Sequence, residues 1–112
     1  MKRIEAIIGP DMVADLCEAL DRIGHHGVTI SAVEGRSAGQ GWAHHVRCGS
    51  YTDSARARSR MEVVVNDEDA GRTIRTIRDA AAGDGAEDGN IFVHDLVDVV
   101  RIRTNESGAA AL

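Results

Sequence analysis

Hydrophobic residues follow two different spacings along this chain, and the change from one to the other predicts the order of its elements. Residues 2–8 (KRIEAII) are short, rich in isoleucine and followed by Gly9 and Pro10, which is typical of a strand. The apolar residues that come next recur at helical spacing: Val13, Leu16, Cys17, Leu20 and Ile23. Gly24 then supplies a stop, so the chain is predicted to begin with a strand and an amphipathic helix that buries Cys17.

The second part of the chain predicts three more strands and one more helix. Residues 27–35 (GVTISAVEG) and 61–65 (MEVVV) are the second and third strands. Asn66 and the three acids after it offer an N-cap to a helix with an inner face of Ala70, Ile74, Ile77 and Ala81. The stretch 87–104 begins as a turn and continues as a long alternating fourth strand, and residues from about 105 are predicted to be a weak tail.

This order predicts an α+β, ferredoxin-like βαββαβ fold, in which two helices cover one face of an antiparallel sheet. At 112 residues, the chain is expected to be a single domain over 1–112. The strands carry apolar residues on both sides, among them Ile7, Val64, Val65 and Phe92. A homo-oligomer that packs sheet against sheet is therefore expected.

Residues 36–58 lose all periodicity and are rich in Gly, Ser, His and Arg. A loop of this length inside a compact domain is usually functional or disordered. We therefore expect residues 36–58 to form a long functional loop.

Composition argues against several classes of function. The formal net charge of -5, the pI near 5.4 and the 3% of aromatic residues argue against binding to nucleic acid. No secretory pattern and no apolar run near 18 residues occur, which predicts a cytoplasmic protein without membrane insertion. Cys17 and Cys48 fit neither a disulfide framework nor a zinc ribbon.

Two features suggest anion binding. Residues two apart in a strand share a face, so Arg101 and Arg103 would present paired guanidinium groups suited to phosphate or carboxylate. Taken alone, the pair is more simply explained as two solvated residues at a strand end. The glycine-rich turn 83–90 (GDGAEDGN) offers backbone N–H groups to an oxyanion, but it matches neither a Walker A loop nor a dinucleotide fingerprint and is by itself explained as a loop.

Histidine pairs at positions 25–26 and 44–45, the second near Cys48, raise the question of a metal site. Neighbouring residues in a strand point to opposite faces, and no CxxC or HxxxH spacing is present, so no metal site is predicted. No nucleophile motif or convincing carboxylate pair is present, so the protein is not expected to be an enzyme.

Several stretches resemble the PII signal-transduction proteins from Met1 to about Glu106 without a gap: MKRIEAIIGPDMVADLCEAL, GVTISAVEG, MEVVV, DGNIFV and VRIRT. The resemblance implies a homotrimer that binds ADP, AMP or ATP, with magnesium in the case of ATP, in the clefts between subunits. It also implies that the long loop controls a partner protein, such as a transporter or an enzyme.

The same resemblance assigns roles to individual residues. The implied nucleotide-binding residues are Thr29, Gly35, Arg36, Ser37, Ala38, Val64, Glu87, Asp88, Gly89, Asn90, Arg101 and Arg103. The implied effector or loop residues are Gln40, Arg47, Tyr51 and Arg58. Arg58 replaces a lysine that meets 2-oxoglutarate in the family, and Tyr51 lies where many members are nucleotidylated, but in an altered context that argues against modification.

Departures from the family pattern refine these expectations. Asn90 and Gly9 each replace a usual lysine, which predicts a shift in preference from ATP towards ADP or AMP. The loop base GRSAGQG differs from the family pattern, which weakens the expectation of 2-oxoglutarate sensing. Divergent members are associated with inorganic carbon and carboxysomes, so a bicarbonate site at Trp42, His44, His45, Arg47 and Arg58 is a further hypothesis. The alternative function is a trimeric metal-binding protein of the copper-tolerance CutA type, with His44, His45 and Cys48 as ligands.

Overall fold

The computed structural model describes residues 1–35, 56–82 and 89–112. Its elements are β1 (Lys2–Ile8), α1 (Val13–Arg22), β2 (Val28–Gly35), β3 (Arg56–Val65), α3 (Asp67–Ala81) and β4 (Ile91–Asp95), with short 3-10 turns η1 (Pro10–Met12) and η3 (Gly108–Ala111). The βαββαβ order confirms the predicted ferredoxin-like fold. Within the described residues, no helix is long and apolar enough to cross a membrane.

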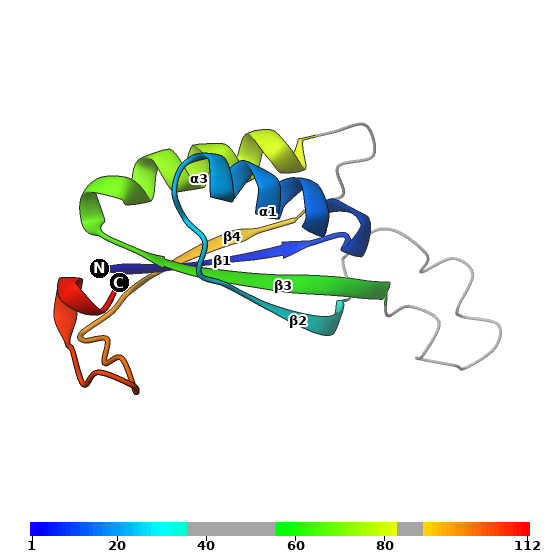
Figure 1. The fold of residues 1–112 in the computed structure, drawn as a ribbon. Coiled ribbons are helices and arrows are strands. Elements are labelled where there is room, and N and C mark those ends of the chain that lie inside the picture. The colour runs from blue at the N-terminus through cyan, green and yellow to red at the C-terminus, as the bar shows by residue number, and fades with distance from the viewer. Residues whose placement is uncertain (36–55, 83–88) are drawn as a thin grey trace, which may run out of the picture.

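The four strands form one antiparallel sheet in the order β2-β3-β1-β4, and both helices lie on the same face of it (Figure 1). Alternate residues of the two central strands point into the space under the helices. Ile4, Ala6 and Ile8 of β1 and Met61, Val63 and Val65 of β3 are buried there. This period of two follows from the pleat of a strand.

The helices complete the core with the residues that their spacing predicted. Leu16 and Leu20 of α1 and Ile77 of α3 are almost fully buried, and Cys17 is partly buried against the same cluster, as expected. Gly24 ends the first helix with a φ of 90°, a conformation that glycine adopts without strain.

β3 is longer than predicted, because it begins at Arg56 rather than at Met61. The sequence RARSR over 56–60 shows no apolar alternation, yet backbone pairing with β2 makes it a strand, with Arg58 opposite Val33 and Arg56 opposite Gly35. The prediction that residues 56–58 belong to the loop is therefore wrong. The rest of the predicted loop, residues 36–55, lies outside the described residues.

β4 is shorter than predicted, because it ends at Asp95 rather than continuing to Thr104. Its only neighbour in the sheet is β1, which starts at Lys2, and Lys2 is paired with Asp95. The last bond of the ladder runs from the Leu96 amide to the Met1 carbonyl. Beyond it the described ranges 1–35, 56–82 and 89–112 offer no further strand as a neighbour, so alternation alone does not extend the sheet. The side-chain bond between Lys2 and Asp95 also raises the pKa of Lys2.

Residues 96–112 form an arm that leaves the sheet beside the start of β1 (Figure 1). Val100 makes an isolated antiparallel bridge with Ser107, and η3 follows it. Residues from 105 onwards, which were predicted to be a weak tail, fold back on the segment that precedes them.

The sheet face away from the helices carries both apolar and charged side chains. Ile7, Val64 and Phe92 point to this face, whereas Val65 is buried under the helices, so apolar residues do lie on both sides. Phe92 is 44% exposed. In the described residues of a single chain, neither helix covers this face (Figure 1).

Candidate functional site

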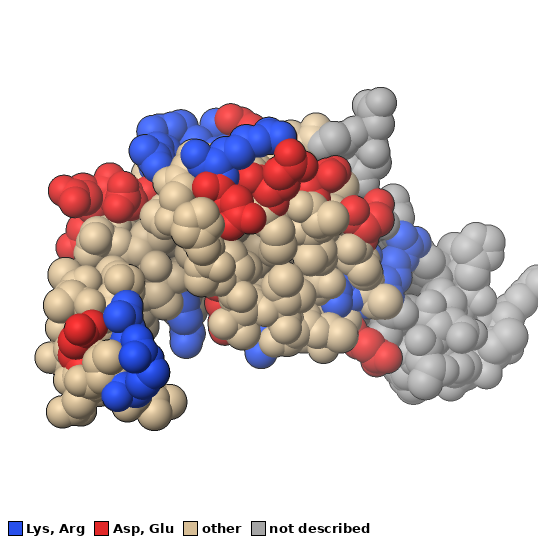
Figure 2. All heavy atoms as spheres, viewed as in Figure 1, with Lys and Arg blue, Asp and Glu red and all other residues tan. Residues whose placement is uncertain are grey.

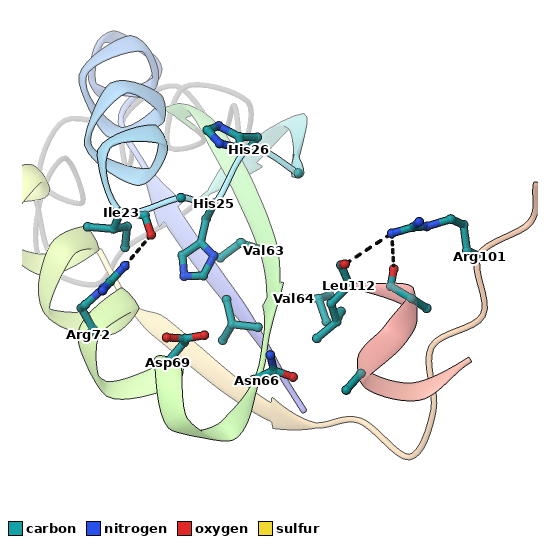
Figure 3. Close-up of a pocket in the computed structure, with 15 residues that line it drawn as sticks. Ile23, His25, His26, Val63, Val64, Asn66, Asp69, Arg72, Arg101 and Leu112 are labelled. Carbon is teal, nitrogen blue, oxygen red and sulfur yellow. Dashed lines mark hydrogen bonds between the residues drawn. The ribbon is translucent and has the colours of Figure 1, made fainter. Parts of the chain in front are cut away.

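A cleft of about 730 Å³ opens at the end of the sheet where α1 ends and α3 begins. Its walls come from the turn after α1, the end of β3, the first turns of α3 and the arm, as Figure 3 shows. The polar groups that line it include His25, Asn66, Asp69, Arg72 and Arg101. The cleft therefore brings segments from four parts of the chain to one place.

Hydrogen bonds fix one wall of this cleft. The Thr73 hydroxyl donates to the Asp69 carbonyl at 2.9 Å, so its oxygen is left to accept from His25 Nε2 at 3.0 Å. Thr73 is fully buried, whereas His25 is half-buried at the rim. Arg72 donates to the Ile23 carbonyl and ties α3 to the turn after α1. These two hydrogen bonds hold the wall together. Each of them joins residues that are far apart in the sequence, by 48 positions in one bond and by 49 in the other.

Replacing Thr73 by valine is expected to lower the free energy of unfolding by about 1–2 kcal/mol, because the half-buried His25 Nε2 loses its acceptor on the fully buried Thr73. Denaturant unfolding would measure this loss. Thr76→Val is the matched control, since Thr76 makes the same kind of bond, to the Arg72 carbonyl, on the exposed side of α3. Equal losses in the two variants would contradict a specific role for the bond to His25.

Arg101 enters the cleft from the arm (Figure 3). Its guanidinium donates to the carbonyls of Ala111 at 3.1 Å and Leu112 at 3.3 Å, and to the Glu106 carboxylate at 3.1 Å. Arg103 lies in the following turn and is exposed. The prediction that the two arginines share one face of a strand is therefore wrong, because this segment turns instead of pairing with the sheet.

Both arginines nevertheless lie on the arm. Figure 2 shows lysine and arginine atoms at the lower left, where the arm lies, and Arg101 and Arg103 are its only basic residues. Val64 also lines the cleft, and Thr29 lies near the start of β2 at the same end of the sheet. Four of the implied nucleotide-binding residues thus lie at one end of the molecule.

The other described site residues lie at the opposite end of the sheet. Gly35 ends β2, and a Cβ at this position would lie 3.1 Å from Arg58 Cγ. Asn90 follows Gly89 and directly precedes β4, and its backbone carbonyl accepts a hydrogen bond from the Ile7 amide at 3.1 Å. The structure does not describe segments 36–55 and 83–88. Gly35 directly precedes the first of them in the sequence, and Gly89 directly follows the second.

The separation between the two groups is large. Thr29 and Gly35 are six positions apart on β2, and Arg58 and Val64 are six apart on β3, so each pair is separated by about 20 Å along its strand. The described residues of one chain therefore do not bring the implied nucleotide-binding residues together into one site. They lie in two groups, one at each end of the sheet.

The remaining sequence predictions for the site lie outside the described residues: Arg36, Ser37, Ala38, Gln40, Arg47, Tyr51, Glu87 and Asp88. The same applies to Trp42, His44, His45 and Cys48, on which the bicarbonate and metal hypotheses depend. Across the described ranges, no three His, Cys, Asp or Glu side chains gather as a metal site would require. His25 and His26 point to different partners, Thr73 and Asp21.

Sequence reasoning did not identify Asn66, Asp69 and Arg72 as lining residues of the cleft. The sequence pattern identifies Asn66 and Asp69 only as residues at the start of a helix, and the Asn66 side chain makes no capping hydrogen bond there. Arg72 follows no motif, and its bond to the Ile23 carbonyl is visible only once the two helices are packed. No local signal predicts these three contacts.

Comparison with known proteins gives consistent matches over the whole chain. The family "Nitrogen regulatory protein P-II" matches residues 1–106. "Nitrogen regulatory protein P-II 1" of Methanothermobacter thermautotrophicus is 39% identical over 112 residues, which cover 100% of this chain and 97% of that protein. "Nitrogen regulatory protein P-II" of Rhizobium meliloti is 38% identical over 112 residues and both full lengths.

A solved structure is also similar. The crystal structure of Arabidopsis thaliana PII bound to citrate superposes with a TM-score of 0.79 and is 34% identical, covering 98% of this chain and 87% of that one. Fold and sequence therefore point to the same relatives.

Proposed function

Since the chain belongs to the nitrogen regulatory protein P-II family, we propose that it is a non-enzymatic signal-transduction regulator that binds an adenine nucleotide between subunits of a homotrimer. Binding of adenine nucleotides is general in this family, and its members regulate partner proteins. The family match favours this function over the metal-binding alternative.

The observation that carries the proposal is the division of the site into two ends. The family role requires Arg101 and Arg103 to meet the same phosphates as the turn at Gly89 and Asn90. In one chain the two groups lie at opposite ends of the sheet. A neighbouring copy, placed so that its arm meets the other end of this chain, supplies the missing half. We therefore place the nucleotide at the boundary between two copies.

The open sheet face supports assembly from the same chain. Glu5 of β1 lies directly opposite Glu62 of β3, and like charges in this position destabilise a sheet. Arg3 Nε, Arg60 Nε and His94 Nε2 are buried on this face and have no hydrogen-bond partner within the described residues. Two of them lie within ion-pair range of these carboxylates, since Arg60 Nε is 4.0 Å from Glu62 Oε1 and His94 Nε2 is 3.8 Å from Glu5 Oε2. Acceptors and donors from neighbouring copies would satisfy these groups, while Ile7, Val64 and Phe92 would be buried.

The proposed ligand preference is ADP or AMP over ATP. Asn90 stands where a lysine is usual, and Asp11 holds its carboxylate so close to Gly9 that a Cβ there would lie 2.7 Å from Asp11 Oδ1. The phosphate-facing end thus has less positive charge than the family pattern. A third phosphate gains less from such a site than from one with both lysines.

Asn90→Lys is expected to increase affinity for ATP by about 10- to 150-fold, because one charge-assisted hydrogen bond contributes roughly 1.5–3 kcal/mol. The gain for AMP is expected to be smaller, because AMP lacks the outer phosphates. Calorimetric titration with AMP and ATP would compare the two. Thr76→Lys, on the exposed side of α3, is the control for added charge elsewhere. An equal gain for AMP and ATP would contradict this placement of Asn90.

We propose that the loop after β2 carries the bound state to the regulated protein. Gly35 and Arg58 flank its ends, so a ligand at that half-site touches the base of the loop. A ligand shifts the equilibrium between two loop conformations only if it binds one of them more tightly than the other. Bicarbonate or 2-oxoglutarate is the proposed second effector, and Arg58 is the described residue whose charge would meet it.

Calorimetry of the purified protein with AMP, ADP and ATP, with and without magnesium, tests the proposed function. Saturable binding of any adenylate, with one site per chain, is the expected result. Repeating the titrations with bicarbonate and with 2-oxoglutarate would identify the second effector by a change in nucleotide affinity. Absence of binding to all three adenylates would refute the proposal.

A further inference from the structure

The guanidinium of Arg101 is already occupied by its own arm. One terminal nitrogen donates to Glu106, and the other donates to the carbonyls of Ala111 and Leu112. Both terminal nitrogens, which a phosphate would use for a two-point contact, are therefore engaged. Arg103, two residues later, is exposed and makes no hydrogen bond or ion pair within the described part of the chain.

The backbone holds the arm closed around this contact. The Arg101 amide donates to the Glu106 carbonyl at 2.8 Å, and the Asn105 amide donates to the Arg101 carbonyl at 2.7 Å. Asn105 takes a φ of 59°, which reverses the chain direction. The Gly108 amide donates to the Val99 carbonyl at 2.9 Å and to Asp98 Oδ1 at 3.1 Å, so the residues after the turn return beside those before it.

The returning segment also lines the cleft. Ala109, Ala111 and Leu112 form part of its wall together with Arg101 and Val64. Figure 3 shows η3 beside the guanidinium, with both carbonyl bonds drawn. Arg101 therefore shares the wall of the cleft with the two residues that accept its hydrogen bonds.

We propose that residues 105–112 are a latch that competes with the ligand phosphate for Arg101, so that nucleotide binding opens the arm. This inference rests on the proposed nucleotide function. Phosphate oxygens replace the two carbonyls and the Glu106 carboxylate as acceptors, and Glu106 in addition repels the incoming anion. The free energy of closing the latch is therefore subtracted from the free energy of binding.

Glu106→Gln tests the latch, because it removes the opposing charge while keeping the size of the side chain. Exposed ion pairs contribute roughly 0.2–1 kcal/mol, so ADP affinity is expected to rise about two- to five-fold. Glu18→Gln is the matched control: it makes the same charge change in another exposed Arg–Glu pair, with Arg22 on α1. Its ADP affinity is expected to equal that of the wild type.

Hydrogen exchange supplies a second measurement that does not depend on the variant. The amides of Asn105 and Gly108 are bonded in the closed arm, and saturating ADP is expected to accelerate their exchange. If wild-type protein binds ADP but Glu106→Gln leaves the affinity unchanged and both amides stay protected, the latch is refuted and the nucleotide function stands. If neither protein binds any adenylate, the proposed function fails and the latch fails with it.

Discussion

Replacing Arg101 and Arg103 together by alanine is expected to weaken ADP binding by at least about 100-fold. Each arginine is proposed to make a charge-assisted contact with phosphate, and each such contact contributes roughly 1.5–3 kcal/mol. The arm carries no other basic residue that could take over. Calorimetry with ADP would measure the loss, and circular dichroism would establish that the variant is folded.

The single variants and the lysine variants sharpen this test. Arg103→Ala removes an exposed side chain and leaves the arm contacts of Arg101 intact, so a loss of affinity in this variant reports on the ligand rather than on the fold. Lysine at both positions keeps the charge but not the planar fork, so an intermediate affinity is expected. Full ADP affinity in the double alanine variant would exclude the arm from the nucleotide site.

Much of the fold could be predicted from the sequence, because the strands and helices of the core follow simple periods. The residues at helical spacing in α1 and the alternating residues of β1 are those that the core buries. Two of the errors concern strand ends. Pairing with β2 extends β3 through residues 56–60 without apolar alternation, and the absence of a partner ends β4 at Asp95 despite alternation beyond it. The residue at which a strand begins or ends depends on the neighbouring strand that it pairs with, and the sequence of the strand itself does not show that pairing.

The candidate site was less predictable for a similar reason. The resemblance identified Val64 and Arg101, which both line the cleft. It did not reveal that Arg101 bonds to carbonyls 10 and 11 residues later, or that Thr73 is fully buried beside His25. Thr73 breaks the apolar pattern of its helix, so hydrophobic periodicity alone assigned the inner face to Ile74, which is only partly buried. These contacts arise from packing between distant segments.

The division of the site between two copies leads to a second large expected effect. Asn90→Glu places a carboxylate at the phosphate-facing end of one half-site, and the double arginine variant inactivates the other. Each variant alone is expected to lose ADP binding. When the two are unfolded together in equal amounts and refolded, binding is expected to return to about one quarter of the wild-type number of sites.

This fraction follows from random assembly of a ring in which each site takes one half from each of two neighbours. An intact site needs its arm from an Asn90→Glu chain and its phosphate-facing end from a chain with intact Asn90, and each choice has a probability of about one half. Mixing the folded variants without unfolding is the control, and it should restore no sites if copies exchange slowly. A site built within one chain would give no recovery after refolding either, because every chain carries one inactive half. Recovery near one quarter would therefore distinguish a shared site from a site within one subunit, independently of which adenylate binds best.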